Sequence, residues 1–385
     1  MSGRLLRRAC TAALAAGIAL APVPAAAEPA PGTTGDRTVA GLLTDLQRLY
    51  REAERATETY NATEERLRRQ RAEVRRLDAE LARARHSLSD SRGAAGRLAR
   101  QQYQSSSGLS PYLRLLLARD PQHAVDQGHV IGRLARERVE TVGRLTGAEK
   151  KAGELSRRSR AALARQTALA QRQEKERDGV RERLGAVEEL LASLTPDQLA
   201  AVAELERSGA AEQQERFLAS GALGDDARPS AEGDRAVRFA VEQLGKPYEW
   251  GAEGPASYDC SGLTSVAWQR AGTPIPRTSQ EQWARLEHVP LEALRPGDLV
   301  VYFPEATHVA LYLGDGMVVQ APRPGAAVKV SPIAANPVLG AVRPDPDGEP
   351  VGRYTPPRLP AGAADGSDEG YAESYAPAAP ETSAR

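Results

Sequence analysis

Cys260 is the side chain of this sequence best suited to covalent chemistry on a carbonyl group. It stands between Asp259 and Ser261, where a helix that runs to about Arg270 is expected to begin. Asp259 can cap this helix, and the dipole and free amides of its first turn favour a thiolate and can stabilise an oxyanion. The pattern indicates a nucleophile. The alternative is a buried cysteine that serves only as a small apolar residue.

A thiolate nucleophile needs a base, and two histidines lie outside the long helical region of the sequence. His288 lies in a polar stretch before Pro290 and is expected at the surface. His308 opens the apolar run 309–313, which predicts a buried strand followed by a turn at 314–316. His308 is therefore the candidate base, unless it is simply a polar residue at the start of a strand.

The register of the hairpin around this turn decides whether Gln320 can assist His308. If all three turn residues lie outside the ladder, Gln320 is opposite Ala310 and shares a face with His308. A two-residue turn places it on the other face. In the first register its amide can hold one imidazole nitrogen and direct the other toward the sulfur. Otherwise Gln320 is an ordinary strand residue.

Metal, cofactor and nucleic-acid chemistry find little support in the sequence. One cysteine and one well-placed histidine fall short of the four ligands of a structural zinc site, and no CxxC, HExxH, GxSxG or dinucleotide motif occurs. Lys+Arg and Asp+Glu both number 51, so the formal charge is zero and gives no argument for nucleic acid. We expect neither a metal nor an organic cofactor.

The start of the 385-residue sequence predicts export. Three arginines precede the apolar run 9–21, and Ala25–Ala27 offers the small residues of a cleavage site. We expect a signal peptide over 1–27, cleaved near Ala27, and a secreted or cell-wall-associated protein; a retained membrane anchor is the alternative. Of the two cysteines, Cys10 leaves with the signal, so Cys260 remains without an internal disulfide partner.

A long helical region is expected over 36–208. From Leu42 to Leu98 apolar and small residues recur in alternating steps of four and three, with no proline, which is typical of a coiled coil. A break with an apolar tip over 105–127 precedes a second such stretch, so we predict an antiparallel hairpin; a parallel oligomer is the alternative. The many arginines suggest either a solvated, salt-bridged face or attraction to anionic wall polymers.

The rest of the chain divides by composition. Residues 209–233 are rich in Gly, Ala, Asp and Pro and are predicted to be a linker, and 344–385 a disordered tail. Residues 234–343 hold all three tryptophans and short alternating runs, and are the segment able to build a compact core.

Six motifs give this segment a family resemblance. They are LGKPYEWG (244–251), YDCSGLT (258–264), PRTSQEQW (276–283), LRPGDLVVY (294–302), HVALYLGDG (308–316) and VVQAP (318–322). Together they resemble the NlpC-type family of papain-like bacterial cell-wall cysteine endopeptidases. The resemblance implies an α+β papain-like catalytic domain, with helices packed on an antiparallel sheet, preceded here by the long all-α coiled-coil hairpin.

By this resemblance Cys260 is the nucleophile, His308 the base and Gln320 the polar third member, where the family often has histidine. Tyr248 matches a tyrosine that helps to bind the oxyanion. Asp259 and Ser261 match substrate-binding positions near the amino end of the substrate, although a cap and a helix start would explain them equally.

The resemblance also implies the reaction. The family cleaves peptidoglycan stem peptides, typically between D-glutamate, through its γ-carboxyl, and a diamino acid. A coiled coil joined to such a domain suggests regulation, either by covering the active site or by docking on a membrane complex of the division machinery. A non-catalytic adaptor that binds wall peptides, and a thiol amidase or acyl transferase on the same fold, remain alternatives.

Overall fold

The computed structural model describes residues 38–105, 120–224 and 227–364. The expected signal peptide, and residues 106–119 of the expected apolar tip, lie outside these described residues. Within them, no helix combines the length and the apolar character that a membrane crossing requires.

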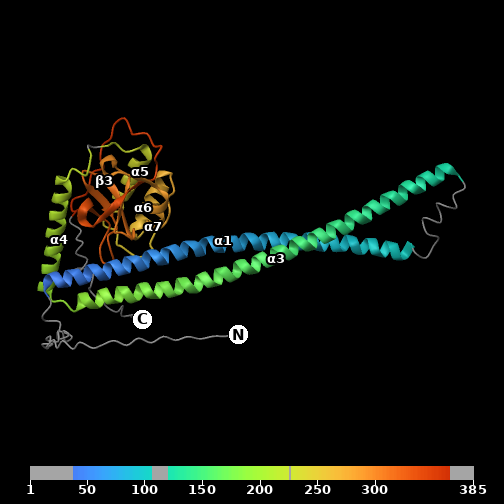
Figure 1. Ribbon diagram of the computed structural model, residues 1–385, viewed down its shortest axis with the longest axis horizontal. Coiled ribbons are helices and arrows are strands. Elements are labelled where there is room, and N and C mark those ends of the chain that lie inside the picture. The colour runs from blue at the N-terminus through green and yellow to red at the C-terminus, as the bar shows by residue number, and fades with distance from the viewer. Residues whose placement is uncertain (1–37, 106–119, 225–226, 365–385) are drawn as a thin grey trace, which may run out of the picture. The chain divides into compact units, whose positions relative to one another are not determined.

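Two long antiparallel helices form the first part of the described chain, as predicted (Figure 1). Helix α1 spans Val39–Ser105, and α3 spans Pro121–Ala192. The carboxylate of Asp120 accepts a hydrogen bond from the Gln122 amide and so caps α3. The two helices belong to one chain and run in opposite directions, so the hairpin is the arrangement observed and the parallel pairing is not.

The contact between α1 and α3 alternates between apolar clusters and polar bridges. Between the clusters, the Gln70 side chain donates to the Ala162 carbonyl at 3.0 Å. The first apolar group is Leu42, Leu46, Tyr50 and Val187, which Leu194 and Val202 beyond α3 join, and the second is Leu77, Leu81, Ala84, Ala152, Leu155 and Ala162. Because alanines make up a large share of the second group, the hairpin buries little apolar surface there.

Helix α4, Pro196–Ala219, corrects the predicted start of the linker at 209. A capping box between Thr195 and Gln198 begins the helix, and Phe217 near its end packs against a core of the compact domain. Helix α5, Ala231–Val241, begins before the predicted end of the linker at 233. Composition alone missed the extent of α4, because packing of Phe217 stabilises a helix in a segment rich in small residues.

The compact domain is an α+β structure built on one antiparallel sheet, as predicted. The sheet has six strands in the order β1-β6-β2-β3-β4-β5. Its further elements are α6 (Cys260–Ala271), α7 (Ser279–Arg285), β1 (Glu287–Val289), η1 (Leu291–Ala293), β2 (Leu299–Tyr302), β3 (His308–Gly314), β4 (Met317–Gln320), β5 (Lys329–Pro332), η2 (Ile333–Ala335) and β6 (Val338–Arg343).

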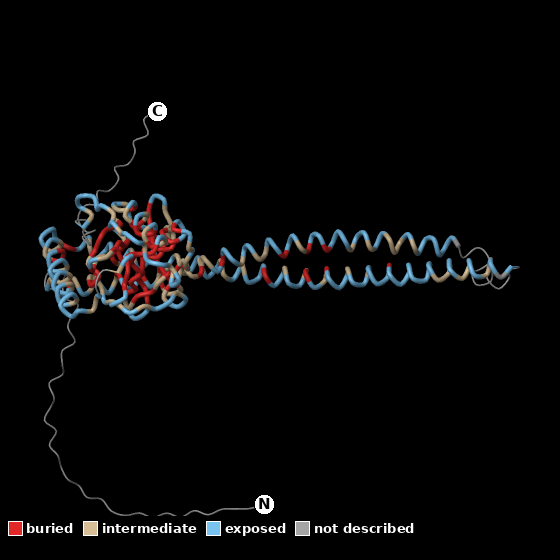
Figure 2. The backbone as a smooth tube through the Cα atoms, turned by 90° about the horizontal axis from the view of Figure 1, so that it is seen from above, coloured by how far each residue is buried: buried red, intermediate tan, exposed pale blue. Residues whose placement is uncertain are grey.

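The sheet carries an apolar core on each face. Alternate strand residues such as Val309 and Leu311 pack with α5 and α6, whereas Ala310 and Tyr312 belong to a second cluster that Phe217 of α4 joins. Trp268 of α6 is fully buried and donates its indole N–H to the Gly297 carbonyl at 3.1 Å. Buried residues are concentrated in this domain and are sparse along the distal hairpin (Figure 2).

Residues 344–364 correct the prediction that the tail from 344 onward is disordered. The Arg295 guanidinium donates to the Asp345 carboxylate at 3.1 Å, and both side chains are almost fully buried. Farther along, the Val351 amide donates to the Pro229 carbonyl, and Ala363 accepts from the Val330 amide, both at 2.9 Å. These bonds hold a segment whose composition, read alone, indicates no core; residues 365–385 lie outside the described chain.

We predict that Asp345→Ala lowers the free energy of unfolding by about 2 kcal/mol, because a buried guanidinium loses its carboxylate partner. Chemical denaturation measures the change. The matched control is Asp347→Ala, since Asp347 is exposed two residues away; equal stability of the two variants would contradict the packed tail.

Candidate active site

Cys260 is the first residue of α6 and is buried, with 3% of its surface exposed. One carboxylate oxygen of Asp259 accepts from the Gly262 amide at 2.6 Å, which caps the helix as predicted. A Cβ on Gly262 would lie 2.1 Å from the Ala252 carbonyl oxygen, so the close approach of these two segments requires glycine. The sulfur is thus placed in the first turn of a capped helix.

The strand register brings Gln320 to His308. Leu311 is paired with Val319 and Tyr312 with Val318, so continuing the ladder sets Gln320 opposite Ala310, on the face of His308. The premise of that register was wrong, because Gly314 pairs with Met317 and the turn therefore has two residues; a bulge at Leu313 shifts the register by one and restores the shared face. The imidazole Nε2 lies 2.7 Å from the Gln320 Oε1. Because an amide oxygen only accepts, Nε2 carries the proton, and Nδ1 is the nitrogen that can take one.

Tyr248 is buried and lies within electrostatic range of Cys260. Burial raises the pKa of its phenol well above the usual value, and negative charge on Cys260 raises it further. The hydroxyl therefore stays protonated and is a hydrogen-bond donor near the sulfur. His288, in contrast, is exposed and its Nε2 lies 2.9 Å from the Trp283 carbonyl, which agrees with the surface position expected for it.

Asp259 and Arg277 form a buried charged pair beside the cysteine. Arg277 donates to both carboxylate oxygens of Asp259, at 3.0 and 2.7 Å, and also to the Ser261 hydroxyl at 2.8 Å. The second carboxylate oxygen of Asp259 accepts from the Gly251 amide at 2.9 Å. Nearby negative charge, Asp259 foremost, raises the pKa of Arg277 against the effect of burial, so the pair remains ionic.

Helix α1 inserts a carboxylate into this cluster. One oxygen of Glu58 accepts from the Ser261 hydroxyl at 2.8 Å and lies 3.9 Å from the Cys260 sulfur. The other oxygen accepts from the Ser279 amide at 2.9 Å. Two donors and the charge of nearby Arg277 thus hold a glutamate side chain directly over the thiol.

Three neighbours of Glu58 on α1 also contact the catalytic domain. Glu54, one turn earlier, places a carboxylate oxygen 3.5 Å from the His308 Nδ1. Asn61 donates its side-chain amide to Asp259 at 3.0 Å, and Tyr60 meets Trp250 edge-on at 4.9 Å between ring centroids. In this arrangement the carboxyl groups of Glu58 and Glu54 lie against Cys260 and His308.

The electrostatics of the covered site disfavour a thiolate. Burial raises the pKa of Cys260 well above its usual value, and the charges of Glu58, Asp259 and Glu54 add to the shift. Burial likewise raises the pKa of Glu58 to about 7 and that of Glu54 to about 8. The thiol of Cys260 therefore stays protonated while α1 is in place, and a protonated thiol is a poor nucleophile.

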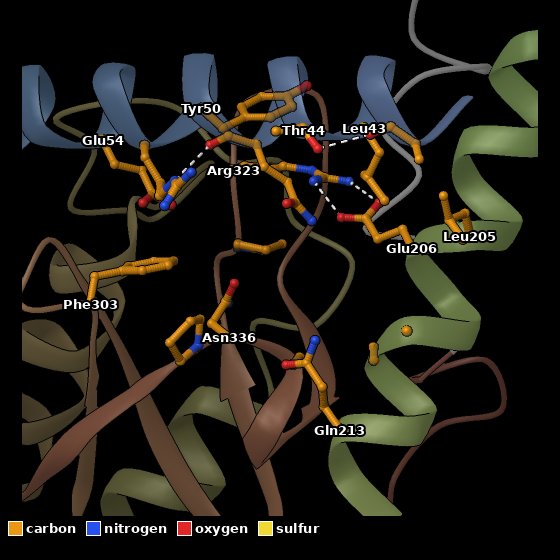
Figure 3. A pocket seen from close by; sticks show the side chains of 18 residues that line it. Leu43, Thr44, Tyr50, Glu54, Leu205, Glu206, Gln213, Phe303, Arg323 and Asn336 are labelled. Atoms are coloured by element: carbon orange, nitrogen blue, oxygen red, sulfur yellow. Dashed lines mark hydrogen bonds and ion pairs between the residues drawn. The ribbon is translucent and has the colours of Figure 1, made fainter. Parts of the chain in front are cut away.

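Arg323 joins α1 and α4 to the catalytic domain next to this cover. Its guanidinium makes two bonds to the Glu206 carboxylate, at 2.8 and 2.9 Å, and lies over the Tyr50 ring at 4.8 Å (Figure 3). The three residues line a cavity of about 480 Å³, which Glu54 also borders. The cover over His308 is thus anchored by contacts from two helices.

Sequence reasoning found the residues around the sulfur but missed the covering ones. Arg277 and Ser279 lie in the motif PRTSQEQW, but neither of them was assigned a role from the sequence. On α1 the covering residues recur every three to four positions, beside the predicted repeat of apolar and small residues; they are Tyr50, Glu54, Glu58 and Asn61. That spacing places them on a second face of the helix, and it is the feature of the sequence from which the covering residues could have been identified.

Among the described residues, no group of three or more His, Cys, Asp or Glu side chains is arranged to hold a metal ion.

Residues 245–340 match the NlpC/P60 family. A probable endopeptidase of Mycobacterium tuberculosis is 39% identical over 116 residues, which are 29% of this chain and 30% of that protein. A probable endopeptidase of Corynebacterium glutamicum is 47% identical over 96 residues, 25% of this chain and 46% of that protein. The chain therefore spans less than half the length of these curated relatives.

Solved structures also resemble part of this chain. Peptidoglycan hydrolase RipB from M. tuberculosis is 27% identical, with a TM-score of 0.27, over 40% of this chain and 87% of that one. The NlpC/p60 domain of peptidoglycan hydrolase SagA is 32% identical, with a TM-score of 0.28, over 29% and 97%.

The carboxyl-terminal part of the chain is therefore an NlpC/P60 domain, as its motifs predicted. In this protein the domain follows a long helical hairpin, whose first helix lies across the predicted active site.

We predict that Arg277→Met destabilises the protein by about 3 kcal/mol or more, because it leaves the fully buried Asp259 carboxylate without its cation. Arg285→Met is the control, since that arginine is mostly exposed. Denaturant unfolding compares the two. Equal stability would mean that the buried pair contributes nothing to the fold.

Proposed function

We propose that this protein is a peptidoglycan hydrolase acting outside the cytoplasm, a cysteine endopeptidase that cuts stem peptides. The observation that carries the proposal is the hydrogen bond from His308 Nε2 to Gln320, in a domain whose helix α6 begins at Cys260. It gives the imidazole the tautomer and the fixed orientation that a general base beside a thiol needs. An export signal cleaved near Ala27 is part of the same proposal.

In the uncovered site His308 takes the proton of Cys260 at Nδ1, and the thiolate attacks the scissile carbonyl carbon. The first-turn amides of α6 and the Tyr248 hydroxyl stabilise the oxyanion. The imidazolium returns its proton to the leaving amine, which leaves an acyl-enzyme. Water, deprotonated by His308, then hydrolyses the thioester and releases the new carboxyl group.

Within this class we propose that the bond cut is the one between D-glutamate, through its γ-carboxyl, and a diamino acid. A γ-linked glutamate keeps its α-carboxylate free, close to the scissile carbonyl. The Ser261 hydroxyl and the Ser279 amide already hold a carboxylate, that of Glu58, 3.9 Å from the sulfur. The α-carboxylate of the substrate would take the place of Glu58, with Arg277 close by.

We further propose that α1 regulates the enzyme by covering the site. Glu58 occupies the carboxylate site beside Cys260, and Glu54 faces the nitrogen of His308 that must accept the proton. Substrate and α1 cannot both use these groups. As the releasing partner we propose a membrane complex of the division machinery that engages the distal hairpin, where Val139 and Val142 are exposed.

Cys260→Ala should abolish cutting of purified cell wall, with a loss of about 10³-fold or more, because the nucleophile is gone. His308→Ala should lose activity similarly, whereas the surface variant His288→Ala should keep it. Mass spectrometry of the released muropeptides identifies the bond. Stem cuts that persist in Cys260→Ala would overturn the assignment; cuts at an amide outside the stem peptide would indicate an amidase.

The fragment 227–364, which lacks α1, should cleave isolated wall about tenfold faster than the mature chain or more, because its site is open. The same fragment carrying Cys260→Ala is the inactive control. Release of soluble muropeptides over time measures both rates. A fragment no faster than the mature chain would rule out inhibition by α1.

A further inference from the structure

Glu54 and Glu58 are separated by one turn of α1 and face the catalytic domain together. The residues are 9% and 1% exposed, and their carboxylates lie against the predicted base and nucleophile. Carboxylates this deeply buried are rare unless cations compensate them. What surrounds each one therefore decides its charge when α1 is in place.

The surroundings of Glu54 compensate a negative charge poorly. From the catalytic domain His308 and Arg323 face it, and from α1 itself Arg51 and the carboxylate of Glu58. Arg323 already makes two bonds to Glu206, so much of its charge is engaged elsewhere. The Oε2 atom of Glu54 has no hydrogen-bond partner among the described residues. A neutral carboxyl fits this position better than a carboxylate.

Glu58 is compensated better but lies close to a second carboxylate. Arg277 is its cation, yet that guanidinium also makes two bonds to Asp259, whose charge opposes ionisation of Glu58. Cys260 is the remaining acid beside it, and Tyr248 also lies within electrostatic range. One arginine thus serves two buried carboxylates, and the site favours a single negative charge.

We propose that closure of α1 over the active site takes up protons on Glu54 and Glu58, so that the cover is released as the pH rises. This inference deepens the proposed function and rests on it, since it concerns access to the same nucleophile. The closed form would then be a proton-dependent latch, and its carboxyl groups the sensors.

The direction follows from the charge of each form. In the open form both side chains are in water and titrate near their usual value of 4.5, whereas burial raises the pKa to about 8 for Glu54 and about 7 for Glu58. Below pH 4.5 both carboxyl groups are protonated in the open and in the closed form, so protonation does not affect the equilibrium between the two forms. Above it, the ratio of closed to open chain falls by up to about tenfold per pH unit for each carboxyl, until its closed-state pKa is passed.

Hydrogen–deuterium exchange of the full mature chain tests the latch without requiring hydrolysis. The Ser279 amide is the reporter, because Glu58 accepts its hydrogen bond only when α1 is in place. Its protection factor, the ratio of intrinsic to observed exchange, should fall by about tenfold or more between pH 5.5 and 8.5. In the Glu54→Gln/Glu58→Gln chain, whose amides stay neutral, it should change by less than about threefold.

Glu52→Gln is the matched control, since Glu52 is an exposed carboxylate on the same helix; this variant should follow the wild type. The single variant Glu54→Gln should show a shallower pH dependence than the wild type and covers the case in which the double variant does not fold. A flat wild-type profile, or a double variant that falls with the wild type, would overturn the latch. A pH-dependent profile in a chain that cuts no wall at any pH would overturn the proposed function and leave the latch standing.

Discussion

The buried ion pair between Asp259 and Arg277 is the interaction on which the site depends. One side chain, Asp259, begins α6 and so fixes the position of Cys260, while also holding the Gly251 amide. Its partner reaches the Ser261 hydroxyl and supplies the positive charge that Glu58 approaches. A buried pair of this kind is costly to desolvate. Its many hydrogen bonds explain how the domain keeps it.

In the proposed function, the positive charge of Arg277 attracts two different groups to one site, the carboxylate of the substrate and that of Glu58. In that proposal, a substrate that carries a carboxylate and the helix that carries Glu58 bind the same donors, so affinity for one implies affinity for the other. Asn61 adds a bond from α1 to Asp259 itself. Recognition and inhibition therefore depend on one set of atoms, and a variant that weakens the pair would weaken both.

The sequence was sufficient for the parts of the structure that local patterns determine. The apolar repeat of α1, the cap at Asp259 and the strand beginning at His308 follow from spacing and residue type. The register that brings Gln320 to His308 does not follow from the length of the turn, because it depends on a bulge at Leu313. The second face of α1 could not be recognised in the same way. Glutamates such as Glu54 and Glu58 on a long helix look like a solvated face, and only contact with a distant segment buries them.

The segment 344–364 is ordered although its composition predicts disorder. Residues 344–364 are poor in apolar side chains, yet Asp345 lies on the buried Arg295, and backbone bonds extend to Ala363. Order there comes from hydrogen bonds to elements far away in sequence, which a compositional argument does not capture. The helical part of the predicted linker was missed for a related reason, because Phe217 finds its apolar partners in another segment.

Because α1 belongs to the same chain as the domain it covers, the inhibition that we propose would be that of a tethered ligand competing with substrate. Its effective concentration is set by the connecting helices and stays constant however dilute the enzyme is. Stem peptides below that level would not displace α1 by mass action. Abundant wall substrate alone would then not activate the enzyme, and activation would depend on whatever moves α1 away from the site.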